Sequence, residues 1–208
     1  MTGGYARRCG WLRLVALAAA CAFAVACGGG DSNVPSGWTG YAGDGYRAAT
    51  APGWELLRFG TAELARPAAL DAAVPDLGGV AVELMQALAA SSAVGSPGVG
   101  MVRVERIDVV VFGDRSAAPP LALVATPCVP SSGAAPSGAR PAGFTAAAPI
   151  TVDGVQATQL VRELAGRLVV LVQRAAGDCV DALMFVSARA ERRADFERFL
   201  GTMRFEAR

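Results

Sequence analysis

Residue types that often do chemistry in enzymes are scarce in this sequence of 208 residues. Histidine is absent, which removes the commonest general base and metal ligand. All 19 basic residues are arginine, so a catalytic Ser–Lys pair is excluded as well. The serines of "ASSAVGSPG" and "PSSGAAPSG" lie in Gly- and Pro-rich segments without a G-x-S-x-G motif. We therefore expect no catalytic residues, no cofactor and no metal.

Pairs of aspartates are the remaining candidates for acid–base catalysis. Asp108 and Asp114 are close in sequence, and so are Asp178 and Asp181. Two carboxylates that meet in a cleft can act as acid and base, as in a hydrolase. Their positions in predicted turns and at strand ends favour solvated side chains instead.

Two other motifs also have ordinary structural interpretations. Gly98-Val99-Gly100 is half of a dinucleotide-binding fingerprint, but the third glycine is missing, which favours a turn. Trp54 could line a pocket, although its place after the Pro52-Gly53 turn favours a core residue.

The first 26 residues have the features of an export signal. Arg7, Arg8 and Arg13 supply positive charge, and residues 14–26 form an apolar run of thirteen residues. This length suits the apolar region of a signal peptide and is short for a membrane span. We therefore predict a signal peptide over residues 1–26, with an uncleaved anchor as the alternative.

A cysteine follows the apolar run directly. The sequence Ala24-Val25-Ala26-Cys27 resembles the lipobox of bacterial lipoproteins, although the commonest lipobox has Leu in place of Ala24. The resemblance implies that cleavage leaves Cys27 as the first mature residue and that a lipid, such as palmitate, acylates it. Cys21 is a second candidate, but more apolar residues follow it. An ordinary secretory signal cleaved near Ala26 is the alternative.

Cys128 and Cys179 are the cysteines that remain in the predicted mature domain. Outside the cytoplasm an isolated pair of this kind predicts a disulfide. The bond would close a loop of roughly 50 residues and stabilise the fold by about 4 kcal/mol. A metal or redox pair is the alternative, but further ligands and the C-x-x-C spacing are both missing.

The predicted mature chain has a nearly balanced charge. The signal contains three of the 19 arginines, so 16 remain in the mature chain. Together with the 18 acidic residues they give a net charge of −2. This balance argues against nucleic acid as a partner. Residues 27–40 would form an acylated, flexible tether, so the acyl chains alone would attach the protein to the membrane.

Hydrophobic periodicity predicts a single α+β domain over residues 41–208. In its first part we expect strands at residues 46–50 and from Trp54 onward, with a helix over residues 76–92 between glycine-containing segments. Val80, Leu84 and Leu88 recur on one face of this helix. Strands are predicted at 101–114 and 121–126. A Pro/Gly/Ser-rich loop over residues 129–143 is either disordered or functional.

The last third has the clearest pattern. Three consecutive strands are predicted over residues 155–164, 167–175 and 179–188, with turns at Ala165-Gly166 and at residues 176–178. An amphipathic helix over residues 189–203 would bury Phe196, Phe199 and Leu200 and end at Gly201, and residues 203–208 would return as an edge strand.

Two parts of the chain resemble PsbP-like domains and in particular LpqN-type lipoproteins. The first is the segment containing Pro52-Gly53-Trp54. The second is the C-terminal part with its three strands, its terminal helix and the sequence "FLGTMRF". The resemblance covers residues 45–60 and 150–206. It implies a central antiparallel sheet flanked by helices, as an α/β/α sandwich, and an extracytoplasmic binding or scaffolding role without a shared catalytic centre.

Three functions remain open. The first is a membrane-anchored, non-catalytic binding or scaffold module of the cell envelope, whose partner would be an envelope protein or an apolar ligand. The second is a carrier of an apolar small molecule or lipid, with a pocket between the helix over 77–91 and the sheet. The third is a hydrolase based on carboxylates.

Overall fold

The computed structural model describes residues 34–92, 104–113, 118–126, 140–164, 166–176 and 179–206. Residues Pro35–Arg208 form one compact unit. The predicted signal peptide, Cys27, Cys128 and most of the 129–143 loop lie outside the described residues.

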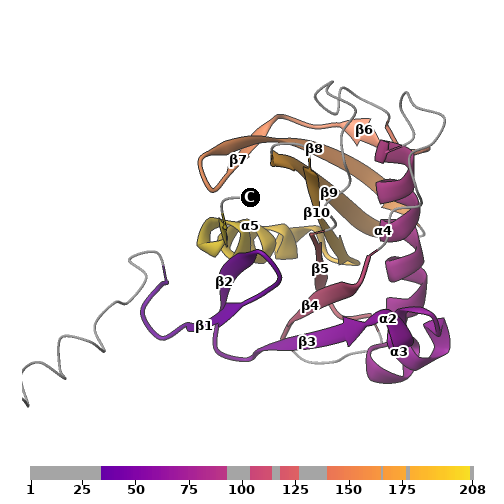
Figure 1. Ribbon diagram of the computed structural model, residues 1–208, viewed down its shortest axis with the longest axis horizontal. Helices are drawn as coiled ribbons and strands as arrows, with labels where there is room; N and C mark the ends of the chain where they lie inside the picture. The colour runs from indigo at the N-terminus through magenta and orange to yellow at the C-terminus, as the bar shows by residue number, and fades with distance from the viewer. Residues whose placement is uncertain are drawn as a thin grey trace, which may run out of the picture. The chain divides into compact units, whose positions relative to one another are not determined.

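Most described strands belong to one antiparallel sheet, which confirms the predicted α+β class (Figure 1). Within the described residues this sheet has eight strands, seven of them in the order β3-β4-β5-β10-β9-β8-β6, while β7 pairs with β8. The strands are β3 (Trp54–Gly60), β4 (Arg106–Phe112), β5 (Leu121–Ala125), β6 (Thr145–Ala146), β7 (Ile150–Val152), β8 (Val155–Leu164), β9 (Arg167–Ala176) and β10 (Cys179–Ser187).

Strands β8, β9 and β10 form the predicted antiparallel meander. Leu164 pairs with Arg167 across the first turn, where Gly166 has a φ of 77° that favours glycine. The two faces of β8 contact different parts of the core, because Leu160 and Ala157 pack into different hydrophobic clusters.

A small second sheet lies beside the main one. In the described residues it consists of β1 (Thr39–Ala42), β2 (Tyr46–Thr50) and β11 (Arg204–Phe205), with β2 in the middle. The Pro52-Gly53 turn therefore leads the chain from the small sheet to β3 of the main sheet. The predicted edge strand near the C-terminus is β11, which pairs with β2 through Arg204 and Phe205.

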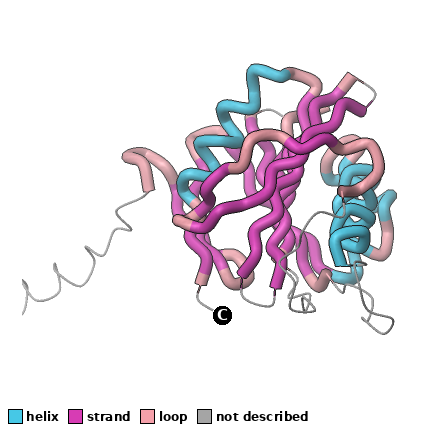
Figure 2. Tube along the Cα trace, turned by 90° about the horizontal axis from the view of Figure 1, so that it is seen from above, coloured by secondary structure: helices cyan, strands magenta, loops and turns pink. Residues whose placement is uncertain are grey.

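Helices lie on both sides of the strands (Figure 2). They are α2 (Thr61–Leu64), α3 (Pro67–Ala73), α4 (Leu77–Ser92), the 3₁₀ helix η1 (Ala190–Arg192) and α5 (Arg193–Thr202). Helices α4 and α5 match predicted helices, whereas α2 and α3 were not predicted. None of the helices among the described residues is long and apolar enough to cross a membrane.

Glycines lie inside both α4 and α5, so the predicted helix end at Gly201 is wrong. Gly78 and Gly79 belong to α4 itself, and α5 continues through Gly201 to Thr202. Gly78 is needed where α4 meets α3, because a Cβ there would lie 2.6 Å from the Pro67 carbonyl oxygen. Its N–H donates a 2.7 Å hydrogen bond to Asp71 Oδ1.

The main sheet separates two hydrophobic clusters. Side chains of α3 and α4 pack on one face around Leu84 and Leu88, while α5 and the small sheet cover the other face around Phe196 and Phe199. These four side chains are at most 2% exposed, as the helical spacing predicts. Both faces of the sheet are therefore filled by packed side chains.

Candidate functional site

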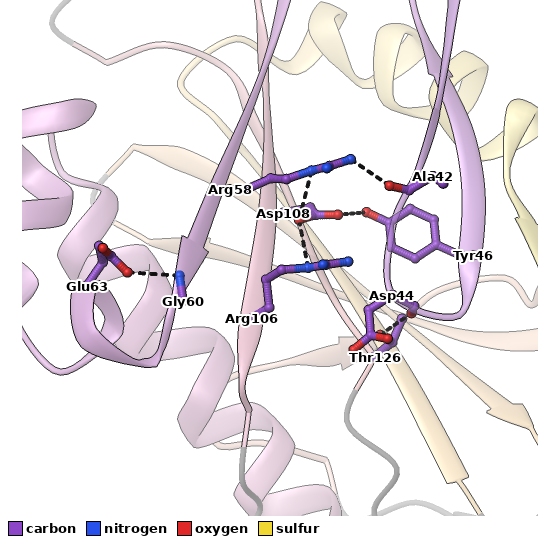
Figure 3. Close-up of polar contacts among 9 residues, drawn as sticks. All are labelled: Ala42, Asp44, Tyr46, Arg58, Gly60, Glu63, Arg106, Asp108 and Thr126. Atoms are coloured by element: carbon purple, nitrogen blue, oxygen red, sulfur yellow. Dashed lines mark hydrogen bonds and ion pairs between the residues drawn. The ribbon is translucent and has the colours of Figure 1, made fainter.

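Asp108 occupies the third position of β4, and its carboxylate points toward Tyr46 of the small sheet (Figure 3). The Tyr46 hydroxyl donates a 2.6 Å hydrogen bond to Asp108 Oδ2. Both residues are 1% exposed. The prediction of a solvated Asp108 is therefore wrong, because alternation along β4 places it on the same buried face as Val110 and Phe112.

Two arginines provide the positive charge that this buried carboxylate needs. Arg106 Nε lies 3.3 Å and Arg58 Nε 3.8 Å from Asp108 Oδ1. Arg58 also donates through Nη2 to the Ala42 carbonyl at 2.6 Å. The cluster formed by Tyr46, Arg58, Arg106 and Asp108 therefore ties β1 and β2 to the edge of the main sheet (Figure 3).

Tyr46 of this cluster and the adjacent Tyr41 are protonated at neutral pH. Burial raises the pKa of Tyr46 far above its ordinary value, and the neighbouring Tyr41 and Asp108 raise it further. Burial likewise raises the pKa of Tyr41, whose ring lies edge to face with Tyr46 at 6.1 Å. Tyr46 therefore acts as a permanent hydrogen-bond donor to Asp108 rather than as a base.

Asp181 forms a second buried ion pair on the same face of the sheet. Arg174 Nη1 donates to Asp181 Oδ2 at 3.1 Å, and the Arg174 guanidinium lies 4.1 Å from the centre of the Phe205 ring. Asp181 is 1% exposed, so the prediction that it is solvated is also wrong. Asp114 and Asp178 lie outside the described residues.

Trp54 lies at the edge of this buried face. Its ring packs edge to face on Phe112 at 4.5 Å and on Trp38 at 5.0 Å. Half-buried Trp54 thus contributes to the aromatic packing beside the Pro52-Gly53 turn, in line with the core interpretation.

A shallow apolar groove lies between α4 and the segment containing α2 and α3. Its volume is about 290 Å³, and its lining residues are Leu64, Leu70, Ala81, Val82, Met85, Gln86, Ala89 and Val104. Val82 is 44% exposed. The groove is on a different side of α4 from the predicted carrier pocket, whose place beside the sheet is filled by Leu84 and Leu88.

A second groove lies between the start of α4 and the β8–β9 hairpin. Its volume is about 470 Å³, and Asp71, Asp76 and Glu83 lie along it. Each carboxylate has a partner: Asp71 accepts from the Gly78 N–H, Asp76 pairs with Arg167, and Glu83 pairs with Arg162. Burial raises the pKa of Glu83, and Arg162 opposes this shift. These contacts link α3, α4 and the sheet.

The described residues contain no group of three or more His, Cys, Asp or Glu that could hold a metal ion. Cys27 and Cys128 lie outside the described part of the chain, and Cys179 is the first residue of β10. The apolar groove was not predicted, because it depends on how α3 packs against α4. The sequence does contain one relevant signal, since Glu83 is the sole charged residue of α4.

The chain matches no protein-family model, no curated protein and no solved structure at a significant level.

Proposed function

We propose that this protein is a lipid-anchored, extracytoplasmic binding module without catalytic activity, and that one face of α4 is its contact surface. This surface, called the α4 face below, consists of Gly79, Val82, Gln86 and Ala89 together with the adjoining apolar groove. Its main support is that the exposed residues of this helix face are uncharged and border a groove whose described lining residues are apolar apart from Gln86.

The composition of the α4 face is unusual for a helix on the outside of a water-soluble domain. Gly79, Val82, Gln86 and Ala89 recur at spacings of three and four residues and are all exposed. A surface helix normally presents charged or polar side chains to water on such a face. Here the one charged residue of the helix, Glu83, turns toward Arg162 of β8 instead. The α4 face therefore suits contact with an apolar partner.

The absence of catalysis is supported by how the buried carboxylates are used. Asp108 and Asp181 are each paired with arginine and are each 1% exposed. A catalytic acid or base must reach its substrate. The short distances from Asp108 to Tyr46 and Arg106 instead suit a structural role that joins the two sheets.

The lipid anchor on Cys27, the extracytoplasmic location and the PsbP-like family rest on the sequence and are part of the proposal. The mass of the N-terminal peptide tests the anchor: an acylated Cys27 supports it, and an unmodified or different N-terminus contradicts it. The disulfide between Cys128 and Cys179 likewise rests on the sequence and is part of the proposal.

The carrier hypothesis has weaker support. A groove of about 290 Å³ is at the lower end of the range for small-molecule sites, which usually enclose most of the ligand. A shallow apolar groove is better suited to one or two side chains of a protein partner.

Photo-cross-linking in the native envelope tests the contact surface. A photoreactive residue is introduced at Val82 in the full chain, and the matched control has it at Glu197, an exposed position on α5 at the other face of the sheet. A protein adduct from position 82 that position 197 does not give supports the proposal. Absence of a protein adduct from position 82, or adducts with lipid alone, would contradict it.

A further inference from the structure

We propose that the occupant of the α4 face is a second copy of this chain, joined through a two-fold interface. The inference rests on the proposed function, because it names the partner of the same surface. The α4 face contains both an exposed apolar side chain, Val82, and an apolar groove that Val82 borders. Val82 is 44% exposed at the edge of the groove, and Met85 and Ala89 continue the groove along the helix.

A two-fold interface requires a surface that fits a copy of itself, because the same patch is present on both sides. With two α4 helices antiparallel, Val82 of each copy would enter the groove of the other. Gly79 and Ala89 have small side chains and allow the helices to approach closely. One surface can therefore supply both halves of the contact.

The charge distribution also favours a second copy. None of Gly79, Val82, Gln86 and Ala89 is charged, but the exposed carboxylates of Asp71 and Asp76 line the second groove together with Gly79. With the two helices antiparallel, the Gly79 end of one copy lies opposite the Ala89 end of the other, so these carboxylates are kept apart from those of the partner copy. A helix that lies on a membrane normally has Lys or Arg on its polar side and Trp, Phe or Leu on its apolar side. Among the described residues of the α4 face there is no Lys, Arg, Trp or Phe, and its leucines are the partly exposed Leu64 and the buried Leu70. Membrane contact through this face is therefore the weaker explanation.

The size of the surface indicates a weak dimer that benefits from the proposed anchor. Helix α4 has 16 residues, which corresponds to a length of about 24 Å. A strip about 20 Å wide over α3 and α4 would bury about 500 Å² per copy, below the roughly 800 Å² of a standard interface. Anchoring both copies in one membrane raises their local concentration, so a small interface can suffice.

Co-isolation of two differently tagged copies tests the inference. Both are made as full chains in the same cells and cross-linked in the intact envelope before detergent extraction, and one tag is used to recover the other. We expect the unsubstituted pair to co-isolate. Val82→Glu in both copies should lower recovery at least about tenfold, because it buries two like charges at the interface. The matched control is Ala194→Glu, which adds the same charge at an exposed position of α5.

The outcomes separate this inference from the proposed function. Co-isolation that Val82→Glu does not reduce, in a variant whose thermal unfolding is unchanged, would overturn the dimer. A cross-link from position 82 to a different protein, without co-isolation of the two copies, would also overturn the dimer but uphold the binding function. Loss of co-isolation with Val82→Glu and its retention with Ala194→Glu would support both.

Discussion

Removal of the Tyr46 hydroxyl should weaken the connection between the small sheet and the main sheet. Tyr46→Phe deletes a 2.6 Å hydrogen bond to the Asp108 carboxylate and leaves the ring in place. A hydrogen bond to a charged group contributes about 1.5–3 kcal/mol, so the free energy of unfolding should fall by about 2 kcal/mol. For a domain of this size that corresponds to a decrease in melting temperature of about 4–8 °C.

Asp108→Asn should have a larger effect, because it leaves two guanidinium groups without their counter-charge. Breaking a buried ion pair costs about 3–5 kcal/mol. The lower end applies here, since the side chains of Arg58 and Arg106 are 46% and 35% exposed and remain partly solvated.

Urea unfolding of the two single variants and the double variant measures the coupling directly. We expect a coupling of about 1–2 kcal/mol between Tyr46 and Asp108, because their hydrogen bond can be lost only once. Additive effects within about 0.3 kcal/mol, or a Tyr46→Phe variant as stable as the parent, would refute the structural role of this cluster.

Three further predictions concern the rest of the fold. Folding raises the pKa values of Tyr41 and Tyr46, so their contribution to the free energy of unfolding is present below the unfolded pKa of about 10 and is lost as the pH rises above it. Stability measured by urea unfolding should therefore fall at alkaline pH, and it should fall less steeply in Tyr46→Phe. Equal slopes in the two proteins would contradict this. Gly78→Ala should destabilise the fold by about 1–3 kcal/mol, because the new Cβ would meet the Pro67 carbonyl. Gly79→Ala has open space around its Cβ and should stabilise the fold by about 0.5–1 kcal/mol. Thermal melts in which both substitutions shift the melting temperature in the same direction would refute the α3–α4 packing. Cys179→Ser should lower the free energy of unfolding by about 4 kcal/mol without a reductant and have little effect with one. Two titratable thiols in the unreduced mature protein would exclude the disulfide.

The sequence was sufficient to predict elements with a regular hydrophobic period. Strand β8 begins with alternating apolar and polar residues, and β9 and β10 are nearly continuous apolar runs between short turns. Helices α4 and α5 have buried residues at helical spacing. Helices α2 and α3 span four and seven residues, too few for a helical period to be recognised. The division into two sheets was also missed, because a turn such as Pro52-Gly53 does not reveal which strands pair.

The polar cluster and the groove depend on tertiary packing that local patterns do not contain. The sequence predicts a solvated Asp108 from its position near predicted turns and strand ends, and an aspartate is buried as a rule only when it is paired. Its partners Tyr46 and Arg58 are far from it in sequence and meet it only when β2 and β3 fold beside β4. The α4 face similarly depends on α3, whose approach is permitted by Gly78.

Side-chain oxidation of Met85 tests most directly whether the α4 face is covered in the native protein. Met85 lines the apolar groove and is partly exposed in the single chain. Hydroxyl-radical footprinting compares intact envelopes with the purified full chain dispersed as monomers in detergent, and half-buried Trp38 and Trp54 serve as internal references. The α4-face proposal predicts severalfold lower oxidation of Met85 in the envelope, with unchanged oxidation of the two tryptophans. Equal oxidation of Met85 in both states would contradict it.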